Sequence, residues 1–335
     1  MGNVHSMTES VSNILTFPFG MVTSALSPAG KNARLSIVIY HRVQEEDDEL
    51  LGVKASAPTF NLQVKYLAEN FNVLPLHEAV QRLQDGTLPS RAACITFDDG
   101  YADNAEVALP ILQKHGVSAT FFIATGFING GIMWNDVVIE WMRRVPVDWL
   151  DLTDMGLGKH VIKTLSQRRE VLFSLINTLK YSPFEIRRQK IDQLCSHISI
   201  PLPDQLMMTT EQVLKLHRAG MGIGGHTVNH PILARLTNEA VYSEIAENKE
   251  TLEQIINAPV RLFAYPNGKP NQDYLSDHIE IIKNLGFDAA CTTAWGSAKN
   301  GSDLYQLPRF TPWNIDYPKF MFHMSRNMVR KVDVV

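Results

Sequence analysis

Residues 93–124 read ACITFDDGYADNAEVALPILQKHGVSATFFIA. A short apolar run ends in two adjacent acids, Asp98 and Asp99. A helical pattern follows and ends at Gly116, and a second apolar run completes the unit. Strand, helix and strand in this order predict a parallel βαβ unit. Two neighbouring carboxylates at the end of a buried strand repel each other and lose hydration, so either a surface turn exposes them or a cation compensates them.

The same alternation of short apolar runs and amphipathic segments continues on both sides of this unit. Further strands are predicted at 35–40, 72–75, 221–225, 261–265 and 288–294. Further helices are predicted at 60–70, 76–86, 210–220, 238–257 and 276–286. This rhythm predicts an α/β fold with a mostly parallel sheet, open or closed into a barrel. Functional sites of such folds gather at the carboxyl ends of the strands, where the acid pair lies.

The rhythm is interrupted between about residues 127 and 208, where three amphipathic helical patterns occur with few strand signals. We therefore expect one domain over 35–320 that carries a helical insertion at about 127–208. An N-terminal segment, 1–34, would precede it, and a C-terminal tail, 321–335, would follow it.

Residues 11–29 are fairly apolar, but prolines and hydroxyl residues interrupt them and no Lys or Arg precedes them. This stretch is too polar for a membrane span and lacks the charge of a secretory signal. We expect a segment docked on the domain, with contact to a membrane surface, or a cryptic signal, as the alternative.

Composition bounds the partners and the compartment. The chain has 31 Lys and Arg against 35 Asp and Glu, so nothing favours nucleic acid as a partner. The three cysteines are widely spaced and form no CxxC pair, which argues against a thiolate zinc site. Free thiols are typical of a reducing compartment, so a cytoplasmic location is expected, with membrane association or export as alternatives.

The second chemical signal is GGHTVNHP, residues 224–231. His226 and His230 are four residues apart, and on a helical turn both imidazoles would face the same way. The two preceding glycines allow close approach of the backbone. Two histidines at this spacing are a weak signal alone. They also follow a predicted strand, so the edge of the sheet that carries the acid pair could carry them as well. Two neutral histidines and one carboxylate, with open positions for water, form a recognised catalytic zinc set.

TFDDGY followed by HTVNH resembles the polysaccharide deacetylase family, whose members share the NodB homology domain and are carbohydrate esterases. The resemblance covers roughly 35–125 and 210–310. It implies a distorted (β/α) barrel that removes N-acetyl, sometimes O-acetyl, groups from glycans. It further implies that Asp98 is the general base for a metal-activated water. The implied metal ligands are Asp99, His226 and His230, and the metal is usually zinc.

Softer matches extend the resemblance. VIYHRV at 38–43 resembles the strand end found in the branch of the family that acts on exopolysaccharides and poly-N-acetylglucosamine. FAYPNG at 263–268 stands where many members have an arginine that orients the base, but here that position is Ala264. Arg261 or Arg309 could supply the charge. The residues that we expect to line the substrate groove are Tyr101, Trp134, Tyr265, Pro266, Asn267 and Arg309.

No motif identifies the general acid that would protonate the leaving amine. Many members of the family use a histidine motif late in the chain, and this sequence lacks it. We expect His41 to take this role, and we expect His323 to be structural. The main hypothesis is thus a metal-dependent deacetylase of an N-acetylated saccharide, such as an exopolysaccharide or a lipid- or nucleotide-linked precursor. The alternatives are a hydrolase of a small non-sugar amide on the same scaffold and a non-catalytic glycan-binding module.

Overall fold

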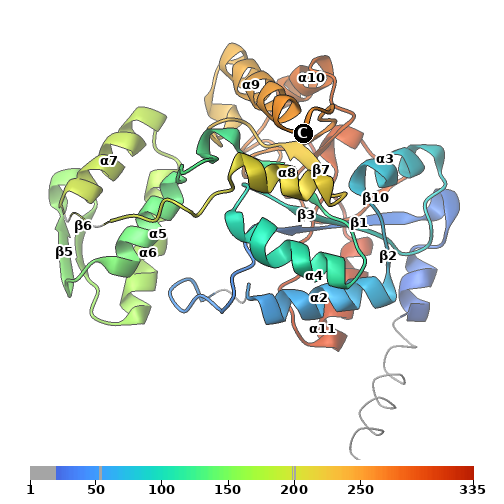
Figure 1. Ribbon diagram of the computed structural model, residues 1–335, viewed down its shortest axis with the longest axis horizontal. Coiled ribbons are helices and arrows are strands. Elements are labelled where there is room, and N and C mark those ends of the chain that lie inside the picture. The colour runs from blue at the N-terminus through green and yellow to red at the C-terminus, as the bar shows by residue number, and fades with distance from the viewer. Residues whose placement is uncertain (1–19, 53–54, 198, 200) are drawn as a thin grey trace, which may run out of the picture.

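The computed structural model describes residues 20–52, 55–197, 199 and 201–335, and its centre is a curled, mostly parallel sheet (Figure 1). Among the described residues the strand order is β10-β1-β3-β4-β7-β8-β9, with β2 beside β3, and the β1–β10 pair alone is antiparallel. The strands of this sheet are β1 (Arg34–Tyr40), β2 (Asn72–Val73), β3 (Ala92–Phe97), β4 (Thr120–Ile123), β7 (Gly222–Gly225), β8 (Leu262–Ala264), β9 (Ala289–Cys291) and β10 (Ala298–Lys299). The expected α/β barrel-type fold is confirmed.

The gap between β9 and β1 is bridged by residues 307–310. The backbone of Leu307 pairs with β9 at Cys291, and that of Phe310 pairs with β1 at Val38, both in parallel. The Phe310 N–H donates to Ile37 O at 2.8 Å and Phe310 O accepts from the Ile39 N–H at 3.0 Å. This segment therefore brings residues late in the chain beside the first strand, close to the end of β3.

Alternate residues of the strands enter two different cores, as the period of two in a strand requires. One set, which includes Ile37, Cys94 and Ala264, faces the barrel interior and packs with α3. The other set, which includes Phe97, Phe121 and Phe263, packs against the outer helices. The helices around the barrel are α2 (Ala57–Asn70), α3 (Leu76–Asp85), α4 (Leu109–Lys114), α8 (Thr210–Arg218), α9 (Asn238–Ile256), α10 (Ser276–Asn284) and α11 (Tyr317–Met328).

The insertion projects to one side of the barrel in Figure 1 and has a core of its own. Its helices are α5 (Trp134–Arg144), α6 (Leu165–Lys180) and α7 (Phe184–His197). It also contains an antiparallel hairpin of β5 (Trp149–Leu152) and β6 (Gly158–Val161). The sequence predicted a helical insertion with few strand signals and did not predict this hairpin, because its strands are four residues each and too short for a clear alternation signal.

The structure allows only a partial comparison with the segments expected at the two chain ends. The N-terminal segment expected at 1–34 lies outside the described residues up to residue 19, and residues 20–26 are helical. The boundary expected at 320 falls inside α11, whose buried Met321, Met324 and Met328 belong to the main core. Residues 321–328 are thus part of the packed domain and not a tail. No helix in the described part of the chain combines the length and apolar character that crossing a membrane requires.

Candidate active site

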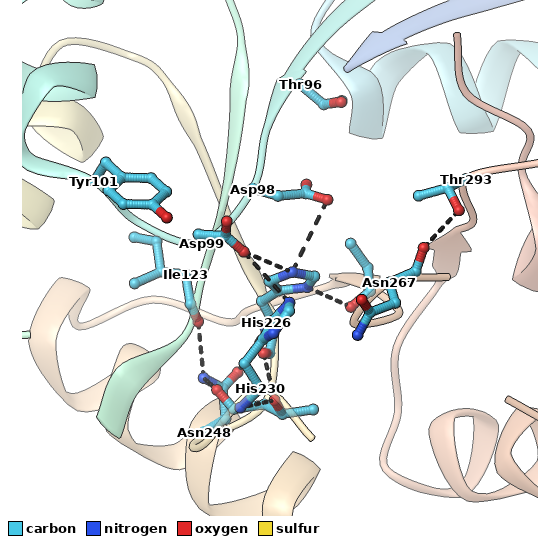
Figure 2. A network of polar contacts seen from close by, with 12 residues as sticks. Thr96, Asp98, Asp99, Tyr101, Ile123, His226, His230, Asn248, Asn267 and Thr293 are labelled. Atoms are coloured by element: carbon cyan, nitrogen blue, oxygen red, sulfur yellow. Dashed lines mark hydrogen bonds and ion pairs between the residues drawn. The ribbon is translucent and has the colours of Figure 1, made fainter. Parts of the chain in front are cut away.

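The acid pair stands directly after β3, at the carboxyl end of the sheet. Asp98 and Asp99 are both buried, so the surface-turn explanation does not apply. Asp99 has φ +77° and Gly100 has φ +92°. A positive φ is strained for an aspartate and persists only where the surroundings hold it. The turn aims both side chains of adjacent residues into the same region (Figure 2).

His226 and His230 follow β7 in a loop, not on the helical turn expected from their spacing. Thr227 has φ +66° and His230 has φ +51°, conformations that end any regular helix. The two rings nevertheless come together, with centroids 4.8 Å apart. The expected close approach at the glycines is present, because a Cβ on Gly225 would lie 2.7 Å from Asn248 Oδ1.

Asp99, His226 and His230 form a donor set that fits a divalent cation. Asp99 Oδ1 lies 3.4 Å from Nε2 of each histidine, and the three donor atoms lie within 4.8 Å of one another. Oδ1 is buried and has no hydrogen-bond partner, which is costly for a carboxylate oxygen unless an ion occupies the site. His226 Nδ1 donates to Ala264 O at 2.7 Å, so Nε2 presents its lone pair to the site.

The electrostatics of the set agree with ligation. Burial, assisted by His226, lowers the pKa of His230 to about 4, so this imidazole is neutral at pH 7. Burial would also lower the pKa of His226, but Asp98 and Asp99 outweigh it and raise that pKa. A cation at Nε2 would compete with this proton. Burial opposes ionisation of Asp99, yet the histidines keep its pKa well below the usual value.

Asn248 on α9 holds the histidine loop in place, and the sequence reasoning missed it. Its side-chain amide donates to Thr227 O at 2.6 Å and to Ile123 O at 2.9 Å. Its Oδ1 accepts from the His226 N–H at 3.1 Å. The Asn248 side chain is completely buried, and its hydrogen bonds join the ends of β4 and β7 (Figure 2). An asparagine on the otherwise apolar buried face of this amphipathic helix was the available signal.

Asp98 is compensated by Arg309, which reaches it from the bridging segment. Nη1 donates to Oδ1 at 2.6 Å and Nη2 to Oδ2 at 2.7 Å, and both side chains are buried. Burial alone would raise the pKa of Asp98, but Arg309 and His226 outweigh it and lower that pKa. Arg309 was expected to line the substrate groove, and this is wrong. It has no exposed surface, and its guanidinium is fully used behind the acid.

Arg261, the other candidate for this charge, lies on the surface and approaches Asp288 at 3.9 Å. The alternation of side chains along β8 explains why the arginine beside the base comes from position 309 and not from β8. Ala264 faces the barrel interior, where an arginine at that position would point, whereas Phe263 and Tyr265 face the outer helices. Leu307 and Arg309 alternate in the same way, so the adjacent segment directs its arginine inward.

The three donors Asp99, His226 and His230, called the metal set below, line a cavity of about 260 Å³. Among the expected residues, His41, Trp134 and Asn267 line it beside Asp98, Asp99, His226 and His230, and Lys180, Arg187 and Thr293 line it without having been expected. Asn267 has φ +61°, and its carbonyl accepts from Thr293 Oγ1 at 2.6 Å. The insertion therefore forms one wall of the cavity, where Trp134 was expected to lie.

Tyr101 lines a second cavity of about 290 Å³, which adjoins the first because His41, Asp99 and Asn135 line both. Its hydroxyl donates to Asp136 of α5 at 2.9 Å. Burial raises the pKa of Asp136 to about 7. Trp313, which is largely exposed, lines the same second cavity.

Tyr265 and Pro266 do not line a groove as expected. Both are buried, and the Tyr265 ring stacks on Tyr274 with centroids 3.9 Å apart. The Tyr265 hydroxyl donates to Tyr305 O at 3.0 Å. His323 lies on α11 and lines a different cavity with Trp295 and Arg330, in keeping with a role outside the site.

Comparison with known proteins agrees with this geometry. The family model for polysaccharide deacetylases matches residues 85–290. A Bacillus subtilis protein assigned to the polysaccharide deacetylases is 22% identical over 289 residues, 86% of this chain and 74% of that protein. The poly-β-1,6-N-acetyl-D-glucosamine N-deacetylase of Staphylococcus epidermidis is 29% identical over 112 residues, 30% of this chain and 38% of that protein.

Among solved structures, a Streptococcus pyogenes deacetylase in complex with acetate superposes with a TM-score of 0.59 and 20% identity. The superposition covers 88% of this chain and 98% of that one. This likeness concerns the fold. The family model spans more than half of the chain, and the chain belongs to the polysaccharide deacetylase family. It is thus a carbohydrate esterase of the class that acts on carbon–nitrogen bonds.

Proposed function

We propose that this protein is a metal-dependent deacetylase that hydrolyses N-acetyl groups of a saccharide. The observation that carries the proposal is Asp99 Oδ1, buried without a hydrogen bond and 3.4 Å from two histidine nitrogens. An ionised Asp98 stands beside it. A non-catalytic glycan-binding module has no use for two buried carboxylates of this kind, because their burial costs several kcal/mol without compensation.

Asp99, His226 and His230 would hold the cation, for which zinc is the default with two histidines and a carboxylate. When bound, such a cation acts as a Lewis acid and lowers the pKa of coordinated water. The chain's own residues supply the proton transfers. Asp98 accepts the proton of the attacking water, and Arg309 keeps the carboxylate ionised and fixed in orientation.

The amine that leaves needs a proton, and His41 is the proposed donor. It is exposed, follows β1, and lines both cavities at the site. Its ring lies near enough to influence the pKa values of Asp98, Asp99 and His230. An imidazole in this position can give a proton to the nitrogen on one side of the scissile bond while Asp98 acts on the other.

A glycan fits the site better than a small amide does. The catalytic cavity is not closed, since it shares walls with a neighbouring cavity of about 290 Å³ and with a groove of about 620 Å³. Trp134 and Trp313 offer aromatic faces of the kind on which sugars stack. The similarity to a staphylococcal poly-β-1,6-N-acetyl-D-glucosamine deacetylase favours an exopolysaccharide. A cytoplasmic enzyme, which the free thiols favour, would instead meet lipid- or nucleotide-linked precursors.

The direct test is acetate release from a panel of N-acetylated oligosaccharides by zinc-loaded and chelated protein. We expect acetate only from the loaded protein, and we expect Asp98→Asn to retain zinc while losing about 10²–10⁴-fold in rate. Acetate release that survives both chelation and Asp98→Asn would refute the proposed chemistry. Turnover of small acetylated amines but of no saccharide would assign the site to the other substrate class.

A further inference from the structure

Two exposed tryptophans stand outside the catalytic cavity, at the edge of the sheet that carries the acid pair. Trp295 follows β9 and is 40% exposed, and Trp313 follows the bridging segment 307–310 and is 60% exposed. β3, β9 and the bridging segment run in the same direction, so the residues that follow them leave the sheet at the same edge. Both rings therefore stand on the face of the barrel that carries the metal set.

The two tryptophans line one cavity of about 420 Å³, called the distal cavity below. The side of α11 that carries Arg326 and Asn327 forms another part of its wall. Trp313 also lines the cavity of about 290 Å³ that has His41 and Asp99 in common with the catalytic one. A chain that leaves the metal set on this side therefore passes the Trp313 ring before it enters the distal cavity.

Trp313 is exposed, but the backbone on both sides of it is fixed. Gln63 on α2 is only 3% exposed, and its Nε2 donates to Pro312 O at 2.5 Å and to Asn314 O at 3.2 Å. Gln63 Oε1 accepts from the Tyr40 hydroxyl at 3.0 Å, which fixes the amide in turn. Since the loop is already ordered, little conformational entropy would be lost when a ligand covers the ring.

Trp295 is supported by the same bridging segment. Its ring packs edge-on against Phe310, with ring centroids 5.5 Å apart. The guanidinium carbon of Arg330 lies 5.0 Å from the centre of the Trp295 ring. Phe310 follows Arg309 directly, so the segment that orients the base at Asp98 also orients this ring.

The distal cavity also contains polar groups that an apolar ligand would not use. Asn327 is only 4% exposed, and its Nδ2 donates to Gly296 O at 2.6 Å. Its Oδ1 is buried and accepts no hydrogen bond from the described residues, although a hydroxyl group could supply one. Arg326 is exposed and offers further donors. Aromatic faces with hydrogen-bonding groups between them suit a sugar, which has an apolar face and a hydroxyl edge.

We propose that Trp313 and Trp295, with the polar residues of α11 between them, form a distal glycan-binding site. It holds further units of the same chain whose N-acetyl group lies at the metal set. The ligand is thus a glycan chain of several units and not a single sugar or a short precursor. This inference rests on the proposed deacetylase function for the course of the chain. Binding at the distal site can be measured without turnover, because no metal-set residue lines that cavity.

The test uses β-1,6- and β-1,4-linked oligomers of N-acetylglucosamine, from the monosaccharide to the hexasaccharide. Calorimetric titration of the zinc-loaded Asp98→Asn protein gives affinities without hydrolysis, and acetate release by the zinc-loaded wild type gives kcat/KM. In at least one series the hexasaccharide should bind about tenfold more tightly than the disaccharide, because two aromatic faces are covered in addition. The value of kcat/KM should rise with chain length in the same series.

Trp313→Ala and Trp295→Ala should each reduce the preference for the hexasaccharide over the disaccharide by about threefold or more. The double variant should bring the two affinities within about twofold. Trp313→Phe should keep most of the preference, since an aromatic face remains. The matched control is Trp149→Ala on β5 of the insertion, which is 61% exposed and should leave the preference unchanged. If Trp295→Ala disturbs the packing on Phe310, the comparison of Trp313→Ala with Trp313→Phe still decides.

Affinities that do not increase with chain length in either series, or an increase that survives both alanine substitutions, would overturn the distal site. So would binding to phosphatidylcholine–phosphatidylglycerol vesicles that Trp313→Ala abolishes, if no chain-length effect accompanies it, since the rings would then contact a lipid surface. Length-dependent binding without acetate release from any oligosaccharide would preserve the distal site and refute the deacetylase. Acetate release that does not depend on length would refute the distal site alone.

Discussion

Arg309 and Asp98 are 211 residues apart in the chain, and yet they form a two-pronged ion pair with both distances below 2.8 Å and with almost no exposed surface. The pair makes it possible to keep an ionised base inside the protein. It exists because residues 307–310 bridge β9 and β1, so that Arg309 faces the barrel interior at the end of β3.

Removing Arg309 should therefore damage stability and activity together. Arg309→Met should lower the free energy of unfolding by about 3–5 kcal/mol, because Asp98 would be left as an uncompensated buried charge. Denaturant unfolding measures this change. Arg261→Met is the control, since its partner is 3.9 Å away at the surface, and it should cost less than about 1 kcal/mol.

The double variant Asp98→Asn with Arg309→Met separates charge from packing. It should be more stable than Arg309→Met alone, because no buried charge remains without a partner. Equal stability of the two variants would show that Arg309 contributes through packing and not through the pair.

His226→Ala should lose zinc affinity by more than about 100-fold, since losses of 10–100-fold already follow from mutation of groups that only orient a ligand. Equilibrium dialysis with metal analysis gives the value. His323→Ala, at a different cavity, should bind zinc like the wild type. Zinc should also raise the melting temperature of the wild type, by an increment that grows with its concentration, and should leave that of His226→Ala unchanged.

His41→Ala should retain zinc and lose about 10²-fold in rate on an N-acetylated sugar, whose amine must be protonated as it leaves. On an aryl acetate the leaving phenolate needs no proton, so the loss should be much smaller. The ratio of the two losses is the measurement. A similar loss on both substrates would mean that His41 positions the substrate and does not donate the proton.

Asn248→Leu should lower the free energy of unfolding by about 1–3 kcal/mol, because the carbonyls of Ile123 and Thr227 would lose their buried donor. Zinc affinity should fall as well, since the same amide fixes the His226 backbone. Gln254→Ala, on the exposed side of the same helix, should change stability by no more than about 0.5 kcal/mol. Full zinc affinity in a destabilised Asn248→Leu protein would show that the loop is held by other contacts.

Asp136 should make stability fall as pH rises. Its pKa is raised from the usual 3.8 to about 7 in the folded chain, so between these values the folded state binds a proton that the unfolded state does not. Unfolding gains driving force over this range and the effect levels off above pH 7. Relative to Asp136→Asn, the wild type should lose up to about 4 kcal/mol between pH 4 and pH 7.

Urea unfolding of both proteins across this range tests the sign. A difference between wild type and Asp136→Asn that is constant with pH would mean that Asp136 is ionised throughout. Tyr101→Phe should enlarge the pH effect, because the Tyr101 hydroxyl donates to the carboxylate and thereby lowers the Asp136 pKa.

The sequence by itself determined the alternation of strands and helices and the three metal-set residues. Short apolar runs separated by amphipathic segments have few alternatives to a parallel sheet, and the acid pair and HTVNH each follow such a run. The local shape of the second motif was not predictable. Its spacing suits a helical turn, but positive φ angles at Thr227 and His230, supported by Asn248, make it a loop.

Only the tertiary structure decided which residues complete the site. From the sequence, Arg309 was one of two possible cations beside the base, and nothing marks Lys180 or Arg187 as part of the site. Arg309 acquires its role from the closure of the barrel between β9 and β1, and the other two from the way the insertion covers one side of the cavity. Tyr265 does not line the groove, because the alternation of side chains along the strand directs it toward the outer helices. Such relations depend on which distant segments meet, and local patterns carry no information about that.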